Sequence, residues 1–514
     1  MLIFRHAREA HRPLELWRRA AEAHDSFDLL LALAQLECAV SDHQGDGCSE
    51  RQAGLLGLTQ RAAAAFLGLG PRPDAQEIAA ARRWLPPESA TLYLGAWEGL
   101  RYYALWPGAY SESAGAWHKA SGGRQPVWIL GLRSMGSILA PVAAAALAAA
   151  GCEVHIATLR PTGHPFDRRL CPAERLQAAW RQFPGTFLIA DEGPGLSGSS
   201  FAGAVVALRG CSVGEERIAL LPGWSPNEER ARELLHPEAA RRWASWRQFP
   251  APPLAPPPEA VRDLSGGLWR GVLRARDAPA WPQHERRKFL LDGVDGGRAI
   301  AKFAGFGPYG RATLERARRL AEAGYGPPPV ADADAYISSG WLVYRCLDAA
   351  PLPARPDAAW CDFAGRYLAF VASEFRLAND VPPSPELQEV LAVNSERLWG
   401  KPCDLPLPSG PCVALDARMQ RIEWGVGAAG FVKFDGTDHH DDPFFPGPAD
   451  IAWDLAAAAI EYGRAVGDAV RVAYCRHSGE SGRVIAGRLP WHASVFAASN
   501  QFQFEPENDA PIDL

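Results

Sequence analysis

The first half of the chain repeats a simple pattern, in which short apolar runs alternate with longer amphipathic segments. An apolar face with helical spacing runs through residues 14–40. Four later apolar runs have the length of buried strands, and helix-length segments separate them: residues 127–130, 153–159, 186–190 and 217–221. Strands that alternate with helices of about 10–15 residues predict an α/β fold, with helices on both faces of a parallel sheet.

The second half opens with a different pattern. Two strand-like runs, residues 287–291 and 298–303, flank a turn rich in glycine and aspartate that is typical of a hairpin. Further elements are expected after the hairpin: a helix at 311–323, a strand at 341–347, and helices at 357–375 and 451–462. The mixture indicates an α+β domain that differs from the first half.

A proline-rich segment separates the two patterns. Residues 250–258 contain six prolines in nine positions, which excludes a helix or a central strand and predicts a stiff linker. A chain of 514 residues is also too long for one ordinary core. We expect one domain at residues 1–249, whose first 120 residues form a helical segment, then a linker at 250–267 and a second domain at 268–514.

Composition narrows the class of protein. Hydrophobic residues make up 47% of the chain and charged residues 22%, values typical of a globular protein. The net charge of -6 argues against nucleic acid as the main partner. The ten cysteines show no zinc-site spacing, and no segment has the form of a signal peptide or a membrane span. A cytoplasmic protein with small-molecule substrates and no membrane partner is therefore expected, and a homodimer is allowed.

The first chemical motif follows the run at 186–190. Asp191 and Glu192 come directly after this run, and a loop rich in glycine and serine leads from them into the next helix. Open α/β sheets bind ligands at the carboxyl ends of their strands, where free N–H groups and a helix N-terminus attract phosphate. A plain strand-to-helix turn with a capping aspartate is the alternative. The acidic pair favours a sugar-phosphate site.

These residues resemble the signature of the type I phosphoribosyltransferases, and the resemblance covers roughly residues 120–225. It implies that Asp191 and Glu192 hold the ribose of phosphoribosyl diphosphate (PRPP), with Mg²⁺. It also implies that two loops bind the phosphates: Arg133, Ser134 and Gly136 in the first, and Gly195, Ser197, Gly198, Ser199 and Ser200 in the second.

A basic segment at residues 160–169 is similar to the mobile loop that closes over pyrophosphate in this family. The resemblance implies catalytic roles for Arg160, His164 and Arg168. Because glycine and proline flank these residues, we expect a loop rather than a regular element. A solvated surface loop is the alternative. Residues 97–103 are rich in aromatics and lie in the segment that matches no family element. Two roles for these aromatics stay open: packing in the core, or forming a hood that covers the acceptor base.

The second domain carries the motifs of a different chemistry. Only five of the 53 basic residues are lysines, and one of them, Lys302, lies in the second strand of the expected hairpin. A helix with Glu315 follows. Downstream, Asp416 and Asp435 each end an apolar run. This order resembles the aminoglycoside/choline kinase group, which implies ATP-binding roles for Lys302 and Glu315, a catalytic Asp416 and a metal-binding Asp435.

The chain also departs from that family. Arg421 occupies the place of the second metal-binding residue, and Glu423 is the nearest acid that could replace it. An insertion, residues 438–442 (Asp-His-His-Asp-Asp), follows Asp435. Three carboxylates and two imidazoles in five residues suit a metal, although a polar loop has the same composition.

Three functions stay open at this point. The first is a bifunctional biosynthetic enzyme, in which PRPP donates phosphoribose to an unidentified acceptor and a second domain uses ATP and Mg²⁺ to phosphorylate a related metabolite. The second is a phosphoribosyltransferase with a non-catalytic kinase-like module. The third is a PRPP- or nucleotide-sensing regulator without turnover.

Overall fold

The computed structural model divides the chain into two compact units, Arg8–Ala255 and Pro256–Leu514. It describes residues 9–45, 49–123, 125–273, 280, 285–377, 385–441 and 448–500. The boundary falls inside the predicted linker. The linker was expected to extend to residue 267, but strand β10 (Ala260–Asp263) already pairs with β11 of the second unit, so ordered structure begins earlier than predicted.

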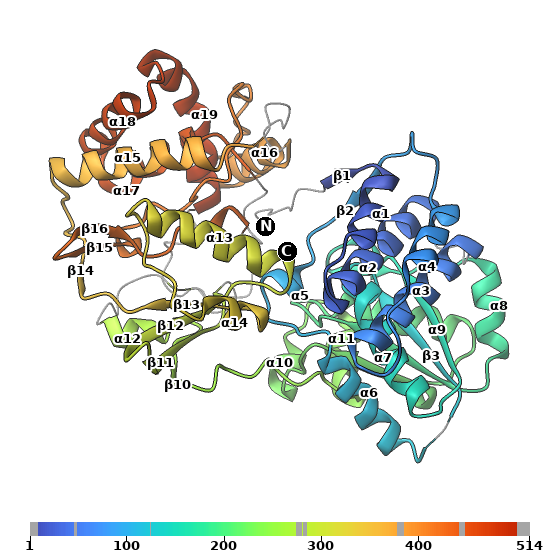
Figure 1. Cartoon of the computed structure of the whole chain (residues 1–514). Helices are drawn as coiled ribbons and strands as arrows, with labels where there is room; N and C mark the ends of the chain where they lie inside the picture. Colours follow the sequence, from blue (N-terminus) through green and yellow to red (C-terminus); the bar gives the residue numbers. More distant parts are fainter. Residues whose placement is uncertain are drawn as a thin grey trace. The chain divides into compact units, whose positions relative to one another are not determined.

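The first unit is built around a five-stranded parallel sheet with the order β4-β3-β7-β8-β9, of which β3 is labelled in Figure 1. Its strands confirm the four apolar runs and add a short edge strand: β3 (Val127–Leu132), β4 (Val154–Leu159), β7 (Thr186–Asp191), β8 (Ile218–Pro222) and β9 (Arg247–Gln248). Because all pairings are parallel, the carboxyl ends of the strands meet at one edge of the sheet.

Helices cover both faces of this sheet, as the alternating pattern predicted. Helix α7 (Gly136–Ala149) contacts β3, β4 and β7, with α2 (Ser26–Gln44) and α3 (Glu50–Phe66) packed against it. The other face packs against α8 (Glu174–Gln182) and α9 (Ser199–Gly210) in a core that includes Trp180, Phe201 and Trp243.

The remaining elements of the first unit are short or peripheral. They are β1 (Glu9–His11), α1 (Pro13–Ala21), α4 (Ala75–Ala80), β2 (Leu92–Leu94), α5 (Glu98–Arg101), α6 (Ala109–Ala120), β5 (Thr162–His164), β6 (Asp167–Arg169), α10 (Glu228–Arg232) and α11 (Pro237–Arg242). The single helix expected at residues 14–40 is in fact two helices. Asp25 caps the second one, and its side chain accepts a hydrogen bond from the Asp28 N–H at 2.8 Å.

The second unit combines two antiparallel sheets with a helical layer. The first sheet has the order β10-β11-β12-β13, with β11 (Lys288–Val294), β12 (Gly297–Phe303) and β13 (Trp341–Arg345). The predicted hairpin is confirmed. Its turn is tighter than expected, because Asp295 and Gly296 both adopt positive φ (48° and 74°), as a two-residue turn requires.

Helices make up most of the rest of this unit (Figure 1). The second sheet has the order β14-β15-β16: β14 (Ala349–Pro351), β15 (Trp424–Gly427) and β16 (Gly430–Lys433). The helices are α12 (Trp269–Leu273), α13 (Pro308–Glu322), α14 (Ala333–Ser338), α15 (Ala358–Glu374), α16 (Pro385–Trp399), α17 (Ala452–Tyr462), α18 (Arg464–Ser478) and α19 (Gly482–Asn500). No helix in the described ranges is both long and apolar enough to cross a bilayer.

Candidate functional sites

The predicted acidic pair lies at the carboxyl edge of the parallel sheet. Asp191 ends β7, where it is paired in register with Pro222 of β8. Its Oδ1 accepts a hydrogen bond from the Glu192 N–H at 2.9 Å, and Glu192 Oε2 accepts one from the Gly99 N–H at 2.8 Å. Burial raises the pKa of Asp191 to about 7 and that of Glu192 well above its ordinary value. Within the described chain neither carboxylate has a salt-bridge partner.

The glycine and serine loop is folded against the basic segment. Ser197 and Ser199 are buried, and both hydroxyls donate to the carbonyl of Pro165, at 3.1 and 2.7 Å. Gly198 has a φ of +65°, and a Cβ there would lie 2.8 Å from the Cβ of Ala239, so the position requires glycine. Gly195 also has positive φ, and Ser200 is half-buried. Two of the hydroxyls expected to bind phosphate are therefore already hydrogen-bonded in this structure.

The turn after β3 holds the other expected phosphate ligands. Gly136 packs against Gly131 so closely that a Cβ on Gly131 would lie 2.2 Å from the Gly136 carbonyl oxygen. The peptide bond between Arg133 and Ser134 is cis. Arg133 is buried, with its Nε 3.0 Å from Asp42 Oδ1.

Arg160, at the end of β4, reaches the same carboxylate. Its Nη2 lies 2.6 Å from Asp42 Oδ2, and its Nη1 donates to the Arg133 carbonyl at 2.6 Å and to Ser134 Oγ at 3.3 Å. Two guanidinium groups thus share one carboxylate at the sheet edge, which leaves an excess of positive charge beside Ser134. Asp42 belongs to α2, in the segment that no family motif covers.

The basic segment is not the loop that the sequence predicted. Strands β5 and β6 form an antiparallel hairpin, in which Gly163 pairs with Arg168 and His164 pairs with Asp167. Arg168 donates to the Gly163 carbonyl at 2.8 Å, and His164 Nδ1 accepts from the Phe166 N–H at 3.2 Å. Proline and glycine occupy the turn and its flank, where a two-stranded ribbon tolerates them. His164 is exposed on this hairpin, and Arg168 is half-buried.

Three contacts of the acidic edge were missed by sequence reasoning. Gly99 donates its N–H to Glu192, and the Tyr110 hydroxyl donates to the Asp191 carbonyl at 2.6 Å. Burial is the main cause of the raised pKa of Glu192, and the negative charge of nearby Glu98 raises it further. The aromatic stretch at 97–103 was the available signal. Trp97 and Tyr102 are buried core residues, while the backbone between them meets the acidic pair.

In the second unit, the structure brings Lys302 and Asp435 together across 133 residues of sequence. Lys302 Nζ donates to both Asp435 oxygens, at 2.7 and 2.6 Å, and to Asp438 Oδ1 at 2.7 Å. Burial alone would raise the pKa of Asp435, but the Lys302 ammonium outweighs burial and the pKa lies well below its ordinary value. The pKa of Lys302 is raised, because Asp435 and Asp438 outweigh its own burial.

Glu315 does not take part in this site, which corrects the prediction. It is more than half exposed and pairs with Arg319 at 2.9 Å on the outer face of α13. The neighbouring Arg316 faces inward instead. Its guanidinium donates to the carbonyls of Gly436 (2.8 Å) and Ala414 (2.6 Å) and lies 3.9 Å from the centre of the Phe375 ring. Helix α13 therefore braces the loops that carry Asp416 and Asp435 rather than contacting Lys302.

Asp416 is completely buried among polar partners. Its Oδ2 accepts from the Tyr367 hydroxyl at 3.0 Å and lies 3.2 Å from Lys433 Nζ, and its Oδ1 lies 3.3 Å from His439 Nδ1. Burial raises its pKa to about 6. A carboxylate enclosed in this way suits a positioning role better than direct contact with a substrate.

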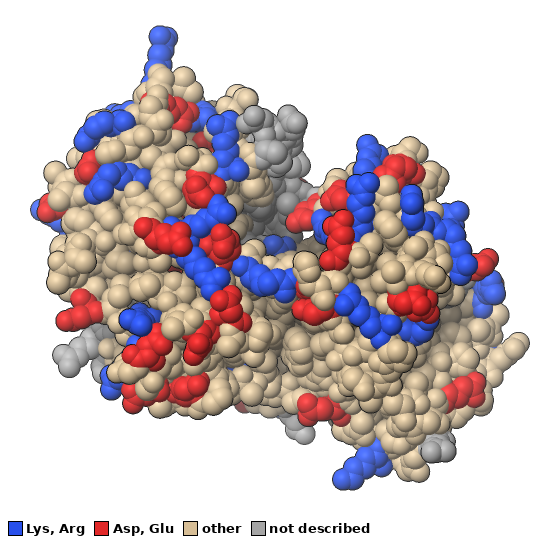
Figure 2. All heavy atoms as spheres, in the orientation of Figure 1, with Lys and Arg blue, Asp and Glu red and all other residues tan. Residues whose placement is uncertain are grey.

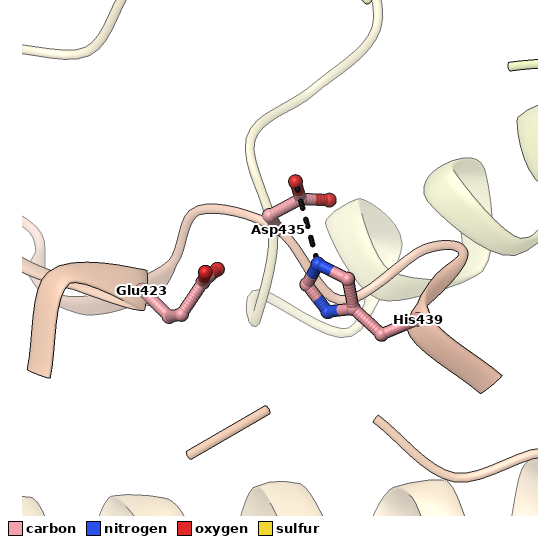
Figure 3. Close-up of side chains that lie close together, drawn as sticks. All are labelled: Glu423, Asp435 and His439. Atoms are coloured by element: carbon pink, nitrogen blue, oxygen red, sulfur yellow. Dashed lines mark ion pairs between the residues drawn. The ribbon is translucent and has the colours of Figure 1, made fainter. Parts of the chain in front are cut away.

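Glu423 and Asp435, the two predicted metal ligands, form a cluster with His439 (Figure 3). One possible ligand atom from each residue lies within 4.8 Å of the others, and all three side chains are half-buried. Burial lowers the pKa of His439 well below its ordinary value, so the imidazole is neutral. The insertion at 438–442 is thus divided: Asp438 pairs with Lys302 and Arg286, His439 joins the cluster, and residue 442 lies outside the described residues.

Charge on the surface is mixed. On the face shown in Figure 2, acidic and basic side chains are interspersed over each unit. This face therefore offers no continuous basic surface of the kind that nucleic acid requires.

No protein-family model matches the chain, and no curated protein matches it. Among solved structures, it is similar to a type I macrolide 2'-phosphotransferase (13% identity, TM-score 0.30, covering 45% of this chain and 88% of that one). It is also similar to the apoenzyme of macrolide 2'-phosphotransferase MphH from Brachybacterium faecium (15% identity, TM-score 0.28, covering 46% and 99%). Similarities at this level carry no functional inference.

Proposed function

We propose that the second unit is an ATP-dependent phosphotransferase. The observation that carries this proposal is the buried contact of Lys302 with Asp435, a strand lysine against an acid that follows another strand. Phosphoryl transfer needs a cation for the phosphate oxygens and carboxylates for a divalent metal, and little covalent chemistry from the protein. Lys302 supplies the cation. Asp435 and Glu423 supply carboxylates that fit a metal, which would neutralise phosphate charge when bound.

A thermal shift assay on the full chain tests this proposal. ATP with Mg²⁺ at about 100 times its dissociation constant should stabilise the protein by about 2.7 kcal/mol. Lys302→Met and Asp435→Asn should lose the shift, whereas Glu315→Gln, which alters only the exposed face of α13, should keep it. A shift that survives both site variants would place the nucleotide elsewhere, and the absence of any shift with ATP, ADP or GTP would remove the proposal.

We further propose that the first unit binds PRPP and transfers its phosphoribosyl group. The specific observation is the meeting of Asp191, Glu192, the glycine and serine loop and Arg160 at one sheet edge. Departure of pyrophosphate leaves positive charge on the sugar ring, which a nearby carboxylate stabilises. The partly exposed Arg160 suits the leaving pyrophosphate, whose oxygens accept planar guanidinium donors, and the buried Arg133 adds positive charge behind it. The acceptor is unidentified.

Calorimetry with PRPP and Mg²⁺ tests the second proposal. The double variant Asp191→Asn/Glu192→Gln should bind at least about 100-fold more weakly, since each charge-assisted contact contributes about 1.5–3 kcal/mol. Glu153→Gln is the matched control, because Glu153 is exposed just before β4 at the opposite edge of the sheet. Equal affinity in wild type and double variant would exclude the acidic pair from the site.

Together the two proposals describe a bifunctional enzyme that adds phosphoribose and phosphate in one biosynthetic route. Two alternatives use the same sites: a second unit that binds nucleotide without transfer, or a sensor without turnover. Transfer of label from [γ-³²P]ATP to a metabolite in cell extract separates the enzyme from both alternatives.

A further inference from the structure

The cluster of Glu423, Asp435 and His439 contains an imidazole, which an oxygen-only magnesium site would lack. The three side chains come from separate short segments: Glu423 from η4 (Arg421–Glu423), Asp435 from the loop after β16, and His439 from η5 (His439–Asp441). Figure 3 shows Asp435 between Glu423 and the His439 ring, with the contact between Asp435 and His439 marked by a dashed line.

The partners of His439 fix which ring nitrogen has a free lone pair. Its Nδ1 lies 3.3 Å from Oδ1 of the fully buried Asp416. A carboxylate in contact with Lys433 and Tyr367 is an acceptor, so Nδ1 carries the hydrogen and donates it. The lone pair is therefore on Nε2. A carboxylate behind an imidazole in this way is the arrangement that orients histidine ligands in metal proteins.

The free nitrogen points into the cluster. His439 Nε2 lies 3.7 Å from Asp435 Oδ2, so two electron-pair donors face each other without a hydrogen between them. Two donors bound to one first-row metal ion, each at about 2.1 Å, lie roughly 3–4 Å apart. The spacing fits a shared cation.

The carboxylates around the cluster already have cationic partners. Asp416, Glu423, Asp435 and Asp438 form direct ion pairs with Lys302, Lys433 and Arg286, and Lys288 and Arg418 add positive charge at longer range. Lys302 holds Asp435, but it also contacts Asp438 at 2.7 Å. A metal ion can therefore share Asp435 while Lys302 keeps a buried partner.

We propose that Glu423, Asp435 and His439 form a site that selects a first-row transition ion, such as Mn²⁺, Co²⁺ or Zn²⁺, over Mg²⁺. His439 Nε2 is the nitrogen ligand, and Asp416 is the residue that positions it. Imidazole favours these ions, whereas Mg²⁺ prefers oxygen donors and keeps its waters. The inference deepens the proposed phosphotransferase, with which it shares Asp435, but the metal site itself does not require nucleotide.

The test uses the full chain and metal ions alone, without nucleotide. Mn²⁺ binding is followed by electron paramagnetic resonance, and pulsed spectra report whether a ¹⁴N nucleus is bonded to the ion. We expect Mn²⁺ to bind at least about tenfold more tightly than Mg²⁺ in competition, with a ¹⁴N coupling typical of a bound imidazole. Mn²⁺ binding without that coupling, or an equal preference for Mg²⁺, would overturn the proposal in the wild-type protein alone.

Variants identify the nitrogen. His439→Gln should remove the ¹⁴N coupling and weaken Mn²⁺ binding by about 10–100-fold, while the affinity for Mg²⁺ changes little. The matched control is His440→Gln, one residue further along η5, which should retain both the coupling and the affinity. If His439→Gln fails to fold, Glu423→Gln serves instead and should lower the Mn²⁺ affinity while it keeps the ¹⁴N coupling. A coupling that persists in His439→Gln, or that disappears in His440→Gln, would show that the nitrogen ligand is another residue.

The experiments distinguish failure of the metal-site proposal from failure of the proposed phosphotransferase function. Nucleotide-dependent stabilisation without a ¹⁴N coupling would keep the phosphotransferase and remove the nitrogen ligand. A ¹⁴N coupling in a protein that binds no nucleotide would keep the metal site and remove the phosphotransferase.

Discussion

The two candidate sites both place carboxylates just beyond an apolar strand, yet they treat the negative charge in opposite ways. Asp191 and Glu192 accept hydrogen bonds from backbone N–H groups, and burial raises their pKa values. Asp435 lies against Lys302, and its pKa is lowered. A bound cation would therefore stabilise the ionised carboxylates of the first site, whereas the second site already contains a cation, Lys302, that can attract a phosphate.

The largest effect on stability is expected from removing the lysine of the second site. Lys302→Met removes the ammonium shared by Asp435 and Asp438 and leaves two carboxylates without it in a buried setting. Loss of one partner from a buried ion pair costs about 3–5 kcal/mol. Hydrogen exchange in β12 and α15 should increase accordingly, with Glu315→Gln as control. Unchanged protection would mean that Lys302 contributes nothing to the charge balance.

The next effect tests the cations of the first site. Asp42→Ala removes the carboxylate between the buried Arg133 and Arg160, and a buried polar group that loses its partner costs about 1–3 kcal/mol. Urea unfolding of the full chain should show this loss in the transition of the first unit. Asp167→Ala, which removes an exposed ion pair with Arg169 and a 3.8 Å contact with His236, serves as control and should change stability by less than about 0.5 kcal/mol.

The pH dependence of Asp191 gives a smaller effect with a definite sign. Its folded pKa, about 7, lies above the ordinary value of 3.8, so its contribution to stability is complete below pH 4 and is lost as pH rises through 7. Asp191→Asn should therefore gain stability relative to wild type between pH 5 and pH 8, on the order of 1 kcal/mol. Unfolding free energies measured across that range check the trend; a gain toward acid pH would reverse the assigned sign.

The smallest effect on stability is expected in the exposed hairpin. Arg168→Ala removes the hydrogen bond to the Gly163 carbonyl, and an exposed hydrogen bond of this kind contributes about 0.5 kcal/mol. If the arginine contacts pyrophosphate during transfer, turnover should fall more than PRPP affinity once an acceptor is known. Equal turnover in the variant would leave Arg168 outside the reaction.

The sequence was sufficient for the buried strands and for the hairpin of the second unit. Uninterrupted apolar runs such as residues 127–130 have few alternatives in a buried sheet, and Asp295-Gly296 specifies a tight turn. It was insufficient where polar contacts decide the outcome. The apolar face is interrupted only by the short polar stretch at residues 22–26, and the Asp25 cap within that stretch divides the expected helix in two.

The sites divide along the same line. Asp191, Asp435 and Lys302 could be found because each occupies a fixed place at the end of, or within, a strand. The prediction that Glu315 faces the site was wrong, because the next residue, Arg316, is the one that points inward. One residue rotates a helix by about 100°, and nothing in hydrophobicity indicates that Arg316 is the buried one, because its partners are carbonyl groups from distant loops. Asp42 and Glu98 were missed for the same reason, since their contacts depend on tertiary structure alone.

The hydroxyls of Ser197 and Ser199 both donate to the Pro165 carbonyl, and a phosphate in the glycine and serine loop would need the same two donors. Ligand and hairpin turn are therefore competitors for the same two donors. The observed dissociation constant equals the intrinsic one divided by the fraction of molecules in which the turn is already detached. A substitution that weakens the turn should tighten anion binding, and a saturating anion should make the peptide bonds of residues 162–169 more accessible to protease.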